Sequence, residues 1–424
     1  MSHLSSRCVS LLATASFLLV TLSANAGDWP AFRGADGTGV SSTKNVPVTW
    51  SAQENIAWKT QLPGAGASSP ILVGKRIYLT CYSGYGVPGE PRGDMSNLKR
   101  HLVCLKRGGG EILWTRTVPS VLPDSERNRE NHGYSTSTPV VDGERVYVFF
   151  GKTGVFAFDL DGKKLWHADA GSKTSGWGSA ASPVICEDLL IVNASVESES
   201  LIALDRKTGK EKWRIGGIKE SWNTPLLTEG ANGQTRLIVA IAGKVLGIDP
   251  AAGKKLWACD TDIPWYMVPS LTADSGVVYC IGGRGTGGAL AIRLGGKGNV
   301  TRSHRLWTLK KGSNVPSLIH HKGYLYWAHE KGSACCADAK TGRLIYQEPL
   351  PRAGQIYASP VLIEGKVYYF SRWAIGYVVS AKPKFELLAT NKLGRVGMIN
   401  SSPAVGDGKL YLRSDKFLFC IAKK

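Results

Sequence analysis

Short runs of alternating apolar and polar residues recur along the chain, and none of them keeps the three-to-four-residue period of an amphipathic helix. Residues 145–150 and 366–370 are examples, rich in Val, Tyr and Phe, and each follows an acidic residue and a glycine. β-branched and aromatic residues favour strands, and such acidic-glycine pairs favour tight turns. The pattern therefore predicts an all-β protein.

A small or polar residue beside a proline opens an apolar strand at eight places. These prolines are Pro70, Pro139, Pro183, Pro225, Pro269, Pro316, Pro360 and Pro403. The first interval is 69 residues, and the other six lie between 42 and 47 residues. A period near 44 residues is typical of a four-stranded antiparallel blade of a β-propeller.

A second repeated pattern is clearest in residues 203–213, which read A-x-D-x-x-T-G-x-x-x-W. In a hairpin, Asp205 would accept hydrogen bonds from the turn amides, and Gly209 would take the positive φ. Trp213 would then cover the seam between two blades. The same ten-residue step joins Cys104 to Trp114, Gly247 to Trp257 and Cys336 to Tyr346.

The two ends of the chain complement each other. The last repeat opens at Pro403 and has no terminal aromatic strand, whereas residues 55–59 form such a strand with no proline-marked strand before it. We therefore expect one eight-bladed propeller, residues 27–424, in which N- and C-terminal strands share a blade and leave no open sheet edge.

Residues 1–26 are typical of a cleaved signal peptide. Arg7 precedes an apolar run, and Ala24 and Ala26 supply the small residues that signal peptidase accepts. Cys8 lies before this run, whereas a lipobox cysteine would follow it. No later run is long enough to span a bilayer, so we expect a periplasmic or extracellular protein.

The formal net charge is +19, of which Arg7 contributes one. Such a balance favours anionic partners, namely polyanionic glycans, anionic lipid headgroups or nucleic acid. The export signal and the spread of basic residues through turns argue against nucleic acid. We interpret most of this charge as a solvated surface.

The A-x-D-x-x-T-G-x-x-x-W repeat resembles the pyrroloquinoline-quinone (PQQ)-like propeller repeat of quinoprotein dehydrogenases and BamB-like outer-membrane assembly factors. Five further segments look like a bacterial subgroup of secreted PQQ-like repeat proteins: residues 28–34, 132–134, 159–162, 312–316 and 381–388. The resemblance covers nearly all of residues 27–424. It implies the propeller fold, and for activity it leaves both a scaffold and a dehydrogenase open.

The resemblance also bears on Cys335 and Cys336. In quinoprotein alcohol dehydrogenases a vicinal cysteine pair forms a disulfide against the PQQ ring, which would be the role of this pair in an enzyme. Cys336 also occupies the small-residue position of the repeat, where Ala203 stands in another blade. Buried cysteine is an ordinary packing residue, and we favour that interpretation.

A calcium-bound quinone would need converging carboxylate and amide oxygens. The repeat commits most acidic residues to hairpin turns, namely Asp159, Asp205, Asp249 and Asp338, and no histidine spacing suits zinc. We therefore predict no metal site and no catalytic set, and we favour a non-enzymatic role, with PQQ and calcium as the alternative cofactors.

The residues just before each proline should ring one mouth of the central channel. Candidate ligand-binding residues at this mouth are His132, Tyr134, Trp177, Trp222, Trp265, Tyr266, Asn314, Tyr357 and Asn400. Aromatic faces with a few amides and an imidazole suit a planar or sugar-like ligand or a peptide strand. The other interpretation is that these side chains pack on one another and fill the channel. Our leading hypothesis is a binding or scaffold module for a protein, peptide or glycan partner, and the alternative is a PQQ- and calcium-dependent dehydrogenase.

Overall fold

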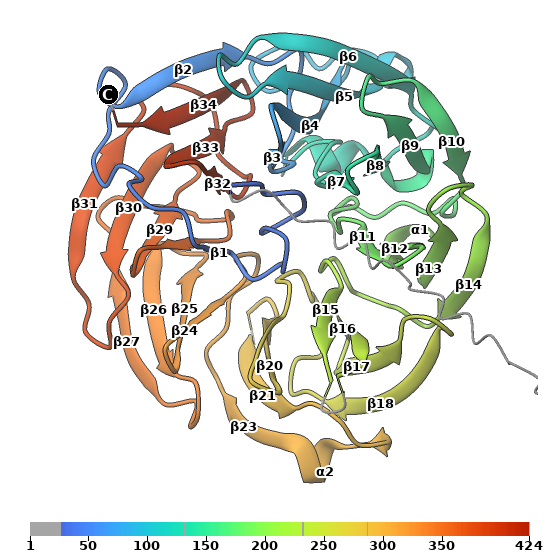
Figure 1. Ribbon diagram of the computed structural model, residues 1–424, viewed down its shortest axis with the longest axis vertical. Coiled ribbons are helices and arrows are strands. Elements are labelled where there is room, and N and C mark those ends of the chain that lie inside the picture. Colours follow the sequence, from blue (N-terminus) through green and yellow to red (C-terminus); the bar gives the residue numbers. More distant parts are fainter. Residues whose placement is uncertain (1–26, 131, 231–232, 286, 424) are drawn as a thin grey trace, which may run out of the picture.

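The computed structural model describes residues 27–423 apart from 131, 231–232 and 286, so the predicted signal peptide lies outside the described residues. Eight β-sheets stand around a central axis (Figure 1). Each contains four antiparallel strands that follow one another from the axis to the perimeter, which confirms the predicted eight-bladed propeller.

We number the blades by their proline marks. Blade 1 contains β3 (Ile71–Val73), β4 (Arg76–Ser83), β5 (Lys99–Lys106) and β6 (Ile112–Pro119); blade 2 contains β7 (Val140–Val141), β8 (Arg145–Phe149), β9 (Val155–Asp159) and β10 (Lys164–Ala168). Blade 3 contains β11 (Val184–Cys186), β12 (Leu189–Ala194), β13 (Ser200–Asp205) and β14 (Glu211–Gly216); blade 4 contains β15 (Leu226–Glu229), β16 (Thr235–Ile241), β17 (Lys244–Asp249) and β18 (Lys254–Asp260).

Blade 5 contains β19 (Thr272–Asp274), β20 (Val277–Gly282), β21 (Gly288–Arg293) and β23 (Arg305–Leu309); blade 6 contains β24 (Ile319–His321), β25 (Tyr324–His329), β26 (Ser333–Asp338) and β27 (Leu344–Pro349). Blade 7 contains β28 (Val361–Ile363), β29 (Lys366–Phe370), β30 (Ile375–Ser380) and β31 (Leu387–Lys392); blade 8 contains β32 (Ala404–Gly406), β33 (Lys409–Arg413), β34 (Phe417–Ala422) and β2 (Ile56–Gln61). Two short strands add in parallel, β1 (Val40–Ser41) to β28 and β22 (Gly298–Asn299) to β18.

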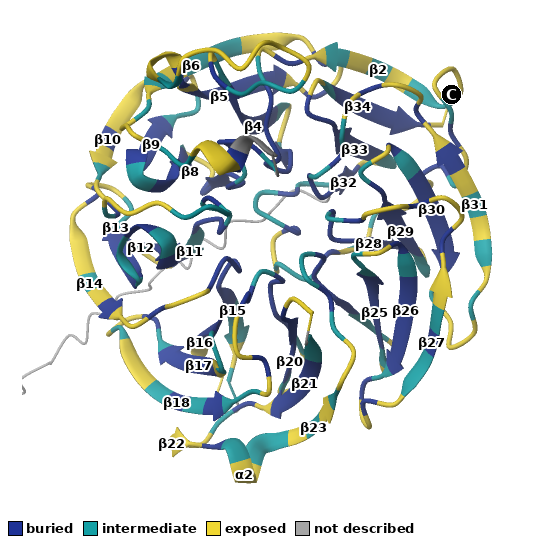
Figure 2. Cartoon of the chain, turned by 180° about the vertical axis from the view of Figure 1, so that it is seen from behind, coloured by how far each residue is buried: buried dark blue, intermediate teal, exposed yellow. Residues whose placement is uncertain are grey.

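Blade 8 closes the ring as the sequence predicts. Strand β2 pairs antiparallel with β34, with Lys59 opposite Phe419. The inner strands of all blades are largely buried, and the outermost strands consist mainly of intermediate and exposed residues (Figure 2). Helical segments within the described residues are at most five residues long, and none of them could cross a membrane.

Tryptophans of the outer strands join neighbouring blades. The indole Nε1 of Trp213 in blade 3 donates to the carbonyl oxygen of Pro250 in blade 4, at 2.9 Å. In the same turn Gly253 has φ +64°, and a Cβ there would lie 2.6 Å from the Trp213 ring, so both the conformation and the space require glycine. The same bond joins Trp166 to Arg206 and Trp307 to Ala339.

A closed ring of hydrogen bonds runs around the channel. In each blade a Ser or Thr beside the proline donates its backbone N–H to the hydroxyl of its counterpart in the next blade, at 3.0–3.1 Å. The members, called the hydroxyl ring below, are Ser69, Thr138, Ser182, Thr224, Ser270, Ser317, Ser359 and Ser402. The eighth bond, from Ser402 to Ser69, closes the circle.

Residues 27–50, called the N-terminal strap below, cross one end of the channel. Trp29 pairs with Leu72 of blade 1, and the Arg33 guanidinium donates to the carbonyl oxygen of Leu318 in blade 6. Burial lowers the pKa of Arg33 to about 9. Leu72 and Leu318 each lie two residues after the proline of their blade, whereas the predicted mouth residues precede the prolines. The strap therefore contacts the channel on one side of the hydroxyl ring, and the predicted mouth lies on the other side.

The hydroxyl ring predicts a specific stability change. Ser359→Ala removes the acceptor of the buried Ser317 N–H, and an unsatisfied buried amide costs about 1–3 kcal/mol. We expect urea unfolding to show a loss of that size. Ser359→Thr should retain most of the stability, because threonine hydroxyls accept the corresponding bond in blades 2 and 4, and the exposed Ser172→Ala should change little. Equal stability of Ser359→Ala and wild type would show that the ring is dispensable.

Candidate ligand site at the channel mouth

The mouth opposite the N-terminal strap contains a cavity of about 390 Å³, to which all eight blades contribute. Seven of the predicted residues line it: His132, Trp177, Trp222, Tyr266, Asn314, Tyr357 and Asn400. They come together because each precedes an inner strand whose position the hydroxyl ring sets. The cavity is the candidate functional site, and we call it the mouth cavity.

The structure places the other two predicted residues outside the cavity lining. Tyr134 is buried below it, where its hydroxyl donates to the carbonyl oxygen of Ser125 at 3.0 Å and its ring packs edge-on against Tyr82. Trp265 is 38% exposed on the rim and packs against Tyr266. Tyr266 has φ +64°, which turns the chain and sends these adjacent rings in different directions.

Hydrogen bonds hold the aromatic walls in place. The Nε1 of Trp222 donates to the carbonyl oxygen of Gly178 at 2.8 Å. The Nε2 of His132 lies 2.7 Å from the Trp177 carbonyl oxygen, and because a carbonyl only accepts, this nitrogen carries the proton. The Nδ1 then accepts from the Thr136 hydroxyl. Burial lowers the pKa of His132, so the imidazole is neutral, and it holds the loop that carries Trp177 in place.

Three arginines that the sequence analysis missed also line the mouth cavity. The guanidinium groups of Arg127 and Arg284 lie 5.1 and 4.5 Å from the centre of the Trp177 ring. The guanidinium of Arg372 lies 4.5 Å from the Tyr357 ring centre, and it donates to the amide oxygens of Asn400 at 2.9 Å and Gln355 at 2.8 Å.

The position of two of these arginines explains why they were missed. Arg284 and Arg372 follow the second strand of their blades, β20 and β29. In an antiparallel blade the end of the second strand lies beside the start of the first, so both reach the same mouth. The proline marks locate only the residues before the first strand of each blade. The two residues that follow the second strand of each blade would have located both arginines.

The charge of the mouth cavity is positive. Its lining carries the three guanidinium groups and the carboxylate of Glu330. Glu330 Oε2 accepts the backbone N–H of Asn314 at 3.3 Å and lies 3.7 Å from the Nδ1 of His329. The Glu330 carboxylate therefore interacts with Asn314 and His329, and the net charge of the lining stays positive.

The lining does not fit a calcium-bound quinone. Calcium takes six to eight oxygen ligands, usually with several carboxylates. Here the carboxylate of Glu330 stands among three arginines, and a divalent cation would be repelled by them. Across the described part of the chain, no group of three or more His, Cys, Asp or Glu residues is placed to hold a metal ion.

Cys335 and Cys336 lie in β26, away from the mouth cavity. Successive residues of a strand point to opposite faces. Cys335 packs in the core between blades 5 and 6, and Cys336 packs in the core between blades 6 and 7. Both are free buried thiols rather than a disulfide, and burial raises the pKa of each to about 12. This placement agrees with the packing interpretation.

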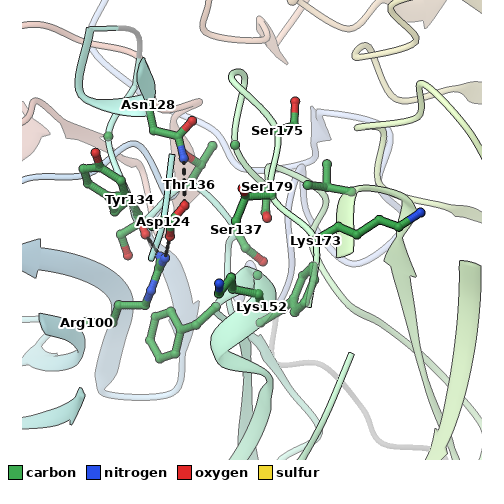
Figure 3. Close-up of a pocket in the computed structure, with 18 residues that line it drawn as sticks. Arg100, Asp124, Asn128, Tyr134, Thr136, Ser137, Lys152, Lys173, Ser175 and Ser179 are labelled. Carbon is green, nitrogen blue, oxygen red and sulfur yellow. Dashed lines mark hydrogen bonds and ion pairs between the residues drawn. The ribbon is translucent and has the colours of Figure 1, made fainter. Parts of the chain in front are cut away.

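A small polar cavity of about 20 Å³ lies beside the mouth, between the ends of blades 1 to 3 (Figure 3). Arg100 points to Asp124 in a buried ion pair, and Asn128 donates to the same carboxyl group at 3.3 Å. The Ser179 hydroxyl donates to Glu197 of the short helix α1 (Ser195–Ser198). This network anchors the loop that carries Trp177.

Burial raises the pKa of Glu197 to about 7, from an ordinary value of 4.5. Between those pH values the folded chain binds more protons than the unfolded chain, so this carboxyl group makes stability fall as pH rises from about 4.5 to 7. Glu197→Gln should flatten that fall by about 2 kcal/mol between pH 5 and pH 7. Urea unfolding at pH 5, 6 and 7 measures it.

The part-exposed Glu199→Gln is the matched control, because Lys173 and Lys219 lower the pKa of Glu199 and keep it ionised over this window. It should keep the wild-type slope. Parallel pH curves for Glu197→Gln and wild type would show that Glu197 is ionised throughout.

The fold and its repeat define a PQQ-like eight-bladed β-propeller. A family model described as outer membrane protein assembly factor BamB matches residues 83–217 and 198–372, and the chain belongs to this family. No curated protein sequence matches the chain.

Three solved structures share the fold. BamB from Moraxella catarrhalis is 13% identical, with a TM-score of 0.61 over 87% of this chain and 98% of that one. A computationally designed protein, Ika8, is 13% identical, with a TM-score of 0.58 over 85% and 98%. A europium-containing methanol dehydrogenase is 13% identical, with a TM-score of 0.52 over 84% and 89%. At these identities the likeness concerns the fold alone.

Proposed function

We propose that this protein is an exported binding module, periplasmic or extracellular, that holds a ligand or partner at the mouth cavity. The observation that carries the proposal is a cavity to which all eight blades contribute and whose walls are aromatic, imidazole and amide groups of blades 2 to 8. The N-terminal strap contacts the opposite side of the hydroxyl ring, so the ligand enters from the mouth. The domain that binds comprises residues 27–424, after removal of a signal peptide, residues 1–26.

The rigidity of the walls supports binding. Trp177 and Trp222 each pack on Tyr266 with ring centres 5.5 Å apart, and hydrogen bonds to the backbone fix both indole-bearing loops. A site whose side chains are fixed before binding loses little conformational entropy when a ligand arrives. Flat aromatic faces with nearby amides suit a sugar-like ligand or a peptide.

The alternative function is a PQQ- and calcium-dependent dehydrogenase. Members of the fold include a europium-containing methanol dehydrogenase, which motivates the alternative. The charge of the mouth cavity opposes calcium, and Cys335 and Cys336 lie in the blade cores. A scaffold role that binds a partner without turnover therefore agrees better with these residues.

Tyr357→Ala tests the mouth cavity, because it removes one aromatic face while leaving the loops that carry the tryptophans. Calorimetry with tetragalacturonate, maltotetraose, hexaglutamate, and PQQ with calcium would define the ligand class. We expect a non-quinone probe to bind the wild type and to bind Tyr357→Ala at least tenfold more weakly, with a melting temperature within a few degrees of wild type.

Tyr324→Ala is the control, since Tyr324 begins β25 at the other end of blade 6. It should bind as the wild type does. Equal affinity of Tyr357→Ala and wild type for every probe would rule out the mouth cavity. Tight binding of PQQ with calcium, accompanied by alcohol oxidation, would establish the dehydrogenase instead.

A further inference from the structure

The mouth cavity continues into a basic groove on the rim of blades 5 and 6. A second cavity of about 500 Å³ shares Arg284, Glu330 and other lining residues with the mouth cavity. Its lining adds the ammonium groups of Lys310, Lys311 and Lys331, all on exposed residues. Together the two cavities form one surface with an excess of positive charge, and we call it the basic mouth.

The arginines of the basic mouth are held against aromatic rings. The guanidinium of Arg284 lies 4.5 Å from the centre of the Trp177 ring and 5.8 Å from that of Tyr266. A guanidinium stacked on a ring keeps its N–H groups in the plane, where they point away from the ring and match the two oxygens of a carboxylate. Arg372 also lies over a ring, that of Tyr357, and bonds from its Nε, Nη1 and Nη2 to Asn400, Gln355 and the Met398 sulfur hold its charge in place.

We propose that the ligand of the basic mouth is an anionic oligosaccharide with carboxylate or sulfate groups on its sugar rings. The inference rests on the proposed function and specifies its ligand. Sugar rings would lie against the part-exposed rings of Trp177 and Tyr357, beside the stacked arginines, and the amides of Asn314, Gln355 and Asn400 would bond to hydroxyls. The acidic groups would pair with Arg284 and Arg372, and the chain would leave across the lysines of the groove.

An acidic peptide fits the lining less well. Peptide recognition gains specificity from pockets that accept alternate side chains. The aliphatic residues of the mouth cavity are small and few, namely Ala67, Ala180, Val268 and Val315. The rest of the lining is aromatic, amide, hydroxyl, imidazole or charged, which suits rings with many hydroxyl groups. The net charge of +19 would concentrate any polyanion near the surface, and the basic mouth would select among them.

The decisive experiment is calorimetric titration of the wild type with tetragalacturonate, a heparin-derived tetrasaccharide and neutral maltotetraose. We expect at least one anionic tetrasaccharide to bind at least tenfold more tightly than maltotetraose, and the carboxylated and sulfated probes to identify which acid is preferred. Raising the salt concentration from 50 to 300 mM should weaken binding of the anionic probe, because charges at the mouth are partly exposed.

Arg284→Gln should weaken binding of the anionic tetrasaccharide at least tenfold and leave that of maltotetraose within twofold. The matched control is Arg302→Gln, which removes one exposed arginine from the short helix α2 (Thr301–His304) at the outer edge of blade 5 (Figure 1). It should change affinity less than twofold. An equal loss in Arg302→Gln would mean that only the overall charge attracts the glycan.

Two outcomes separate this inference from the function on which it rests. If Tyr357→Ala weakens binding of a neutral or peptide probe and Arg284→Gln binds it normally, the mouth cavity is the site and the anionic saccharide is wrong. If hexaglutamate binds more tightly than both anionic saccharides and depends on Arg284, the ligand is an acidic peptide. If anionic saccharides bind with no dependence on Tyr357 or Arg284, both proposals are wrong.

Discussion

The hydroxyl ring is the interaction on which the geometry of this propeller depends. Eight backbone N–H groups each donate to a hydroxyl of the next blade, and the bond from Ser402 to Ser69 joins the last blade to the first. Because every bond lies beside a proline, which limits the backbone to extended conformations, the start of each inner strand is fixed in both position and direction. The tryptophan bonds at the outer strands, such as that of Trp213 to Pro250, then hold the blades at the perimeter. Each blade is tied to its neighbours near the axis, and blades 2 and 3, 3 and 4, and 5 and 6 are tied again at the edge.

The mouth cavity follows from this arrangement. Most of its walls are side chains two to six residues before the hydroxyl ring, so the ring positions the loops that carry them, and bonds such as those of His132 and Trp222 fix their orientation. On the other side of the ring the N-terminal strap buries Arg33 against Leu318. One end of the channel is therefore used for stability, and the other presents aromatic faces and arginines. Because positive charge is concentrated at this end, we propose a negatively charged ligand.

The sequence predicted what depends on a repeated local pattern. Proline spacing and the hairpin signature gave eight blades and the shared closing blade, and residues before each proline gave seven lining residues of the mouth cavity. The hydroxyls beside the prolines were seen only as small or polar residues, because their partners stand more than 40 residues away. Arg284 and Arg372 were missed because they reach the mouth from the second strand of a blade. The side-chain directions of Tyr134 and Trp265 depend on the positive φ angles of Gly133 and Tyr266, which the spacing of the prolines does not predict. The strap was outside the repeat and had no pattern to predict its path.

Hydrogen–deuterium exchange with saturating tetragalacturonate tests the central claim most directly, since it locates the ligand without any substitution. The account predicts slower exchange of backbone amides in residues 132–136, 177–180 and 355–357, which surround the mouth cavity, and unchanged exchange in the outer strands and in the N-terminal strap. Protection confined to the outer strands, or to the strap, would contradict a site at the mouth.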